Sequence, residues 1–187
     1  MKMNLKDYIE EGLAARKSID TEKIRYLARE MLSRFDKGGK LITFGNGGSA
    51  ADAQHFVGEL DGHFTIERKA LPAIALSTNT SSLTAIGNDY SYAEVFSRPV
   101  SALATSKDIV VGISTSGNSQ NVINALLEAK KKGALTVALT GSTGGKLAGI
   151  VDVLLNAGSD FTPVIQEVHI SMIHIICLEM DNLMEED

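Results

Sequence analysis

Two side chains that can bind a metal ion or carry protons, His55 and Glu59, lie four residues apart in this chain. Residues four apart on a helix share one face, so the imidazole and the carboxylate are expected side by side. They follow the turn Gly45-Asn46-Gly47-Gly48-Ser49, which itself follows an apolar run, Leu41–Phe44. A helix that starts in a glycine turn presents unpaired N–H groups and a positive dipole end. The stretch therefore predicts an anion cradle joined to chemically active groups.

A second loop has the same position after a strand-like run. Residues Ser114-Thr115-Ser116-Gly117-Asn118-Ser119 carry four hydroxyls, follow Ile109–Ile113 and precede an expected helix, Gln120–Lys131. Hydroxyls and N–H groups can surround a phosphate without lysine or arginine, and loops at the carboxyl ends of parallel strands meet at one edge of a sheet. Turns and caps use the same residue types, so each loop alone has a purely structural interpretation. Two such loops together favour an anion site.

The kind of phosphate compound follows by exclusion. Gly45, Gly47 and Ala50 formally match a dinucleotide fingerprint, but the next strand ends in Ser77-Thr78-Asn79, without an acid to hold a ribose. The sequence contains no G-x-x-x-x-G-K-[ST] phosphate loop. A small phosphorylated metabolite is the ligand class that remains.

The elements that must position these residues alternate along the chain. Apolar residues at helical spacing predict helices in residues 1–38, broken around residues 18–21. Short strand-like runs then alternate with helix-length segments; the runs are Leu41–Phe44, Ala73–Leu76, Ile109–Ile113, Thr136–Leu139 and Val151–Leu155. Such alternation predicts an α/β fold with a parallel sheet covered on both faces. We interpret residues 1–187 as one domain, with an α/β core in residues 39–187.

The last segment, Thr162–Met184, is apolar around most of a helix and needs cover on every face. One domain can cover about half of it, so we expect subunits to pack helix against helix. Cys177 lies among apolar residues and is expected to be buried.

A net charge of −5 argues against a nucleic-acid or anionic-membrane surface. The polar start and the lack of an 18-residue apolar run predict a soluble, cytoplasmic protein.

Taken in order, several motifs resemble the sugar isomerase (SIS) domain family and, within it, the phosphoheptose isomerases. These motifs are Gly45–Ala50 with Asp52–Phe56, Thr84–Tyr90, Ile113–Ser119 and Ile165–His169. The resemblance implies a three-layer, flavodoxin-like αβα sandwich around five parallel strands, and a homotetramer. It also implies conversion of sedoheptulose 7-phosphate to D-glycero-D-manno-heptose 7-phosphate through an enediol, the first step of heptose synthesis for a bacterial polysaccharide. A related non-enzymatic SIS protein, a sugar-phosphate sensor or a replication-initiator-associating protein, is the competing interpretation.

The resemblance also assigns residues. It implies one Zn²⁺ per subunit, held by His55, Glu59, Gln166 and His174, with Glu59 and His174 also acting as acid and base. Residues that match sugar-phosphate contacts are Asn46, Gly47, Gly48, Ser49, Asn88, Asp89, Ser114, Thr115, Ser116, Ser119 and Gln166. The replication-associated relatives lack the catalytic Glu and the last His, whereas this chain has both.

Physical chemistry leaves two points of this assignment open. Glu59 and His174 cannot be ordinary zinc ligands and free proton carriers at once, so either substrate displaces them or metal and catalysis compete. Gln166 and His174 lie about 12 Å and 80° apart along a straight helix, so either the first turn is distorted or the two come from different subunits. His169 lies about 140° round the helix from His174, which predicts a packed histidine.

Three further positions affect how the resemblance is interpreted. Asn88-Asp89 also suits a plain helix C-cap and turn. His63 and Pro163-Val164 stand where the family often has charged residues, arginine among them, which affects the expected grip on phosphate and the preferred sugar.

Overall fold

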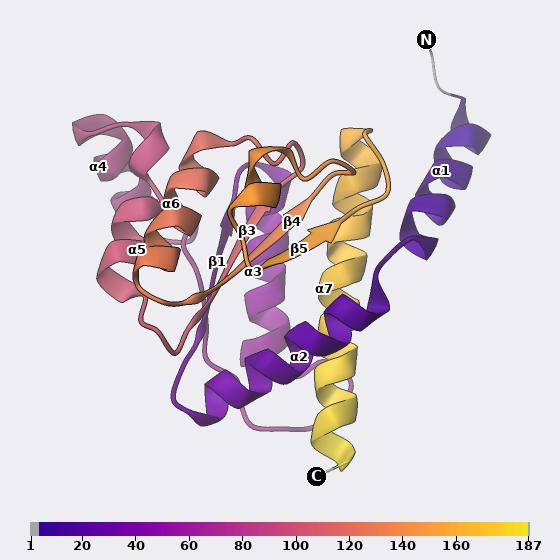
Figure 1. Cartoon of the computed structure of the whole chain (residues 1–187), viewed down its shortest axis with the longest axis horizontal. Coiled ribbons are helices and arrows are strands. Elements are labelled where there is room, and N and C mark those ends of the chain that lie inside the picture. Colours follow the sequence, from indigo (N-terminus) through magenta and orange to yellow (C-terminus); the bar gives the residue numbers. More distant parts are fainter. Residues whose placement is uncertain (1–3, 187) are drawn as a thin grey trace.

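Five parallel strands form a single sheet in the computed structural model of the chain, which describes residues 4–186 (Figure 1). The strands are β1 Leu41–Gly45, β2 Ala73–Ala75, β3 Ile109–Ser114, β4 Leu135–Thr140 and β5 Val153–Asn156, in the order β2-β1-β3-β4-β5. This is the flavodoxin-like doubly wound order. The prediction of a five-stranded parallel sheet is confirmed. β5 starts two residues later than predicted, and the Asp152 carboxylate before it accepts hydrogen bonds from Thr136.

Helices cover both faces of this sheet and complete the three layers that the resemblance implied (Figure 1). Side chains of α2, α3 and α7 pack on one face, and those of α5 and α6 on the other. The helices are α1 Leu5–Lys17, α2 Thr21–Asp36, α3 Gly48–Asp61, α4 Thr80–Asp89, α5 Ser97–Leu103, α6 Gln120–Lys131 and α7 Thr162–Glu186, with short 3₁₀ turns η1 Tyr92–Glu94 and η2 Gly145–Gly149. The predicted helical N-terminal segment is confirmed, and Asp20 caps α2 by accepting from the Lys23 N–H.

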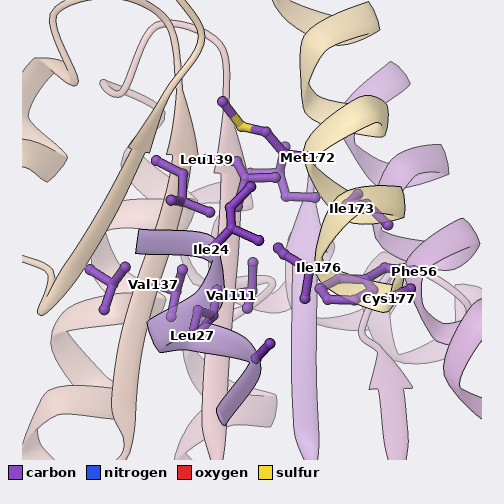
Figure 2. Close-up of a cluster of buried hydrophobic side chains, with 14 of the residues drawn as sticks. Ile24, Leu27, Phe56, Val111, Val137, Leu139, Met172, Ile173, Ile176 and Cys177 are labelled. Atoms are coloured by element: carbon purple, nitrogen blue, oxygen red, sulfur yellow. The ribbon is translucent and has the colours of Figure 1, made fainter. Parts of the chain in front are cut away.

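Alternation along the strands divides the buried side chains into two cores. Val111 of β3 and Val137 of β4 point to the face that meets α2, α3 and α7 (Figure 2). Their neighbours Val110 and Ala138 face the core under α5 and α6. Residues two apart on a strand share a face, so central strands must be apolar on both sides, which explains their continuous apolar runs.

Helix α7 supplies much of the first core. Met172, Ile173, Ile176 and Cys177 are buried there, and Phe56 of α3 lies beside Cys177 (Figure 2). Cys177 is buried, as predicted, and burial raises the pKa of its thiol to about 12. By length and mean hydropathy α7 is also the one described helix that could cross a membrane. Half of the apolar 18-residue stretch on which this rests is buried inside the protein. Packing on the sheet explains the buried part of its apolar surface.

The sheet order sets the place where a ligand can bind. β1 and β3 are neighbours in the sheet although β2 lies between them in the sequence. In doubly wound sheets, ligands bind beyond the carboxyl ends of the strands at such a switch point. The loops Gly45–Ser49 and Ser114–Ser119 extend from those two strand ends, so the fold places both predicted loops at the switch point.

Candidate functional site

The glycine turn after β1 is shaped by contacts that only glycine allows. A Cβ on Gly45 would lie 2.7 Å from the Ser49 Cβ, and Gly47 has a φ of +55° with open space beside it. The N–H groups of Ser49 and Ala50 bond to the carbonyls of Asn46 and Gly47. Gly47 and Gly48 are exposed at the start of α3, where helical N–H groups have no internal acceptor. The turn therefore offers main-chain donors to an anion.

Asn46 joins this turn to α6 on the far side of the switch point. The Asn46 and Asn121 side-chain amides exchange two hydrogen bonds, at 3.0 and 2.9 Å, and the Tyr92 hydroxyl donates to Asn46 Oδ1 at 3.0 Å. Oδ1 thus has two donors already. Sequence reasoning missed Asn121 and Tyr92, although an amide at the start of α6 beside a polar loop was the available signal. The Asn46 side chain therefore joins the glycine turn to the start of α6 and to η1.

Two hydroxyls in the loop after β3 pair with each other, and a third bonds to the backbone of the loop. Ser114 Oγ lies 3.0 Å from Ser119 Oγ across the loop, and Ser116 Oγ accepts from the Asn118 N–H at 3.1 Å. Ser114 is buried, whereas Ser116 is exposed. The loop therefore presents hydroxyls of fixed orientation near the glycine turn.

A third loop, Gly141–Gly145 after β4, supports the hydroxyl loop from behind and was not singled out in the sequence. Gly141 donates its N–H to the Thr115 carbonyl at 2.9 Å. A Cβ on Gly117 would lie 2.1 Å from the Gly144 carbonyl oxygen. A Cβ on Gly145 would lie 2.4 Å from the Ser116 carbonyl oxygen, so this backbone contact needs glycine on both sides. The run Gly141–Gly145 therefore supports the Ser114–Ser119 loop.

Three metal-ligating side chains converge where α3 faces α7. His55 Nε2 lies 2.7 Å from Glu59 Oε1 and 3.0 Å from His174 Nε2, and the three ligand atoms lie within 4.8 Å of one another. Glu59 and His174 are half-buried and His55 is exposed. His174 also packs against the Phe64 ring, with centroids 5.6 Å apart. The structure thus brings together three of the four residues that the resemblance assigns to a metal.

This donor set fits a divalent cation. Tetrahedral bonds of about 2 Å separate ligand atoms by roughly 3.3 Å, close to the 2.7 and 3.0 Å at which His55 Nε2 lies from Glu59 and His174. Two imidazole nitrogens and a carboxylate oxygen at such distances compete for the same proton, and a cation would satisfy all three. We call His55, Glu59 and His174 the cation cluster.

Gln166, the fourth predicted ligand, lies in the first turns of α7 against the start of α3. A Cβ on Gly48 would be 2.5 Å from Gln166 Nε2. The Gln166 amide therefore lies beside the glycine turn. The assignments of Gln166 as ligand and as substrate contact stay predictions.

A buried ion pair that the sequence did not reveal fixes α7 beside the end of α3. Arg68 Nε bonds to Asp181 Oδ1 at 2.9 Å, and the two side chains are 3% and 1% exposed. Arg68 also donates to the carbonyls of Glu59 and Leu60, and Thr65 donates twice to Asp181. Arg68 therefore caps the end of α3, and these hydrogen bonds engage its guanidinium away from the Gly45–Ser49 and Ser114–Ser119 loops. We call this the Arg68–Asp181 cluster.

Other predicted residues lie around this edge of the sheet. Asn88 and Asp89 are exposed at the end of α4, with Asn88 Nδ2 donating to Asp89 Oδ1 at 2.8 Å, and they precede η1, which carries Tyr92. Burial raises the pKa of Asp52 to about 6, although nearby His55 opposes this. His169 is the packed histidine that was predicted, fully buried with Nε2 3.0 Å from the Thr140 carbonyl oxygen.

Fold and site together define a class. A flavodoxin-like sheet carries two polar loops at its switch point and a cluster of proton-carrying groups on the adjoining helices, and residues 6–141 match the family model of the SIS domain. SIS-domain proteins are therefore the class to which this fold and sequence point.

Relatives along nearly the whole chain narrow that class. A probable phosphoheptose isomerase from Thermoplasma acidophilum is 59% identical over 179 residues, 96% of this chain and 98% of the relative. A phosphoheptose isomerase from Helicobacter pylori is 48% identical, over 92% of this chain and 91% of its own. The solved phosphoheptose isomerase of Neisseria gonorrhoeae superposes with a TM-score of 0.87 at 45% identity, over 94% of this chain and 95% of that one. The chain belongs to the phosphoheptose isomerase family of SIS-domain proteins.

Proposed function

We propose that this protein is a metal-assisted isomerase that converts sedoheptulose 7-phosphate to D-glycero-D-manno-heptose 7-phosphate. The observation that carries the proposal is the convergence of His55, Glu59 and His174 beside the two switch-point loops. High identity to named phosphoheptose isomerases, over nearly their full lengths, supports the substrate. The reaction would take place in the cytoplasm, and its product would supply heptose for a surface polysaccharide.

The phosphate end of the substrate is assigned to the loops. N–H groups of Gly47 and Gly48 and hydroxyls of Ser114, Thr115, Ser116 and Ser119 would surround the phosphate, with the α3 dipole adding positive potential. From Gly48 to His55, α3 rises about 10 Å, comparable to an extended seven-carbon sugar phosphate. A substrate held by its phosphate at the glycine turn would therefore bring its C1 and C2 atoms to the cation cluster. Asn88 and Asp89 would contact its hydroxyls.

Isomerisation moves a proton from C1 to C2 through an enediol, and a second proton between the two oxygens. Glu59 Oε1 faces His55, which leaves Oε2 to take the proton from C1 and return it to C2. His174, held between His55 and Phe64, would exchange a proton with the sugar oxygens. A Zn²⁺ ion held by His55, Glu59, Gln166 and His174 would supply Lewis-acid polarisation of the carbonyl. Glu59 and His174 cannot hold the ion and carry protons at once, so the proposed mechanism requires that substrate displaces them from it.

The test is turnover of sedoheptulose 7-phosphate by purified protein, with zinc and after chelation, for wild type and Glu59→Gln. Loss of the carboxylate base should lower kcat by about 10²–10⁴-fold, because this is the usual contribution of general base catalysis. Glu128→Gln is the matched control and should leave kcat unchanged, because Glu128 pairs with Lys131 at the end of α6 that is remote from the Ser114–Ser119 loop. No turnover by wild type in any condition would refute the isomerase, and full activity of Glu59→Gln would refute the mechanism.

Assembly into a homo-oligomer, a tetramer by resemblance, forms part of the proposal. Leu5, Ile9 and Leu13 recur every four residues on α1 and are 85%, 60% and 56% exposed, and Leu178 of α7 is 42% exposed. An apolar stripe of this kind marks a surface that another chain covers. Sedimentation at micromolar concentration should show the oligomer, and a monomer would refute it.

A further inference from the structure

His169 is a buried histidine that the proposed chemistry does not use. It lies on α7 between Gln166 and His174, with no exposed surface. Its Nδ1 atom has no hydrogen-bond partner among the described residues. A buried polar atom without a partner costs free energy that an aliphatic side chain of similar size would avoid. The benefit of a histidine here must therefore come from its other nitrogen.

Nε2 of His169 is a donor by elimination. It lies 3.0 Å from the Thr140 carbonyl oxygen, which can only accept, so Nε2 carries the proton. Burial lowers the pKa of His169 to about 4, so the ring is neutral near pH 7 and Nδ1 is unprotonated. The Ala157 N–H donates to the same carbonyl at 2.8 Å. The carbonyl at the end of β4 is thus held by two donors, one of them on α7.

The other side of the same peptide unit holds the hydroxyl loop. The Thr140–Gly141 peptide accepts from His169 through its C=O and donates its N–H to the Thr115 carbonyl at 2.9 Å. A Cβ on Gly141 would lie 2.6 Å from that carbonyl oxygen, so the two backbones are in close contact here. Hydrogen bonds in such a chain polarise one another. One rigid peptide therefore connects α7 to the Ser114–Ser119 loop.

We propose that His169 is a positioning residue for the substrate's phosphate: through the Thr140–Gly141 peptide it fixes the Ser114–Ser119 loop relative to the helix that carries His174. The inference rests on the proposed function of that loop. For a long substrate, the phosphate-binding loop and the proton-carrying side chains must stay at a fixed distance. His169 joins that loop to α7, which carries His174. It acts through Thr115 and touches no substrate.

The test compares His169→Leu, which fills the space without a donor, with His169→Gln, which keeps a side-chain N–H at similar reach. In His169→Leu, exchange of the Gly141 amide hydrogen should accelerate, and affinity for inorganic phosphate should fall by about two- to tenfold, the value of one net hydrogen bond. KM for the sugar phosphate should rise by the same factor with kcat and zinc content unchanged. His169→Gln should restore all three readouts.

Two further variants keep the inference falsifiable. Ser171→Ala removes a hydroxyl that bonds only to the Glu167 carbonyl within α7, and should change none of the readouts. Gly141→Ala displaces the same peptide while His169 stays, and it should weaken phosphate binding. This variant replaces His169→Leu if His169→Leu fails to fold. Wild-type exchange and phosphate affinity in His169→Leu, or in Gly141→Ala where that variant replaces it, would overturn the proposal. Amide exchange and phosphate binding need no turnover, so a failed isomerase assay would leave this test intact.

Discussion

Two polar clusters join α3 and its following segment to α7, and they differ in what completes them. In the Arg68–Asp181 cluster opposite charges meet at 2.9 Å and are almost fully buried. In the cation cluster, two imidazoles and a carboxylate meet at similar distances, partly open to solvent. Asp181 lies seven residues after His174, about 10 Å along the same helix. The same pair of segments therefore carries both.

The difference separates support from chemistry. Arg68 and Asp181 satisfy each other, and Thr65 and the α3 carbonyls take up their remaining hydrogen bonds. The two imidazole nitrogens and the carboxylate oxygen of the cation cluster compete for one proton, and only a bound cation would satisfy all three. The first cluster should therefore dominate stability and the second should dominate ligand binding, and each prediction below tests that division.

Breaking the Arg68–Asp181 cluster should have the largest effect on stability. Asp181→Asn leaves a buried guanidinium without a counter-charge, which typically costs 3–5 kcal/mol. Urea unfolding at fixed protein concentration measures this loss. Glu10→Gln, which removes an exposed ion pair with Lys6, is the control and should be almost neutral. A small loss for Asp181→Asn would remove the basis of the comparison.

The pH dependence of that loss sharpens the comparison. Burial alone would raise the pKa of Asp181, but hydrogen bonds from Thr65, Arg68 and Ile66 outweigh it and hold the pKa below its usual value. A lowered native pKa gives stability that is present above the unfolded value of about 3.9 and is lost as pH falls through the native pKa. Wild type and Asp181→Asn should therefore converge in stability below about pH 4. A constant difference down to pH 2 would show that charge is not the cause.

Gly48→Ala should have the smallest effect and should be confined to ligand binding. Its methyl group would meet Gln166 Nε2 at 2.5 Å, and this flexible side chain can move aside. We expect KM to rise by less than about tenfold, since one hydrogen-bonding group is displaced. Gly58→Ala on the same helix meets nothing within 4 Å and should stabilise the helix by about 0.5–1 kcal/mol. An unchanged KM in Gly48→Ala would separate Gln166 from the site.

The sequence predicted the features that repeat or that glycine requires. Strand runs such as Ile109–Ile113 were visible because both faces of a central strand are buried. His55 and Glu59 were paired correctly because four residues make about one helical turn. Gly45 and Gly47 marked the cradle because close contacts and a positive φ there exclude other residues.

What the sequence could not predict are the contacts between distant segments. Nothing local to Arg68 indicates that its partner is Asp181, 113 residues away. The Asn46–Asn121 amide pair likewise depends on β1 and β3 becoming neighbours. The support from Gly141 to Thr115 was missed because its signal, a glycine-rich run, also occurs in ordinary turns.

The most direct test of the cation cluster is isothermal titration calorimetry with Zn²⁺ on metal-free protein, for wild type, His55→Gln, His174→Gln and Asp181→Asn. The account predicts one zinc ion per chain in wild type and in folded Asp181→Asn, and binding weakened by at least about tenfold in each histidine variant, because each loses one ligand. Wild type that binds no zinc, or histidine variants that bind it with unchanged affinity, would contradict the account.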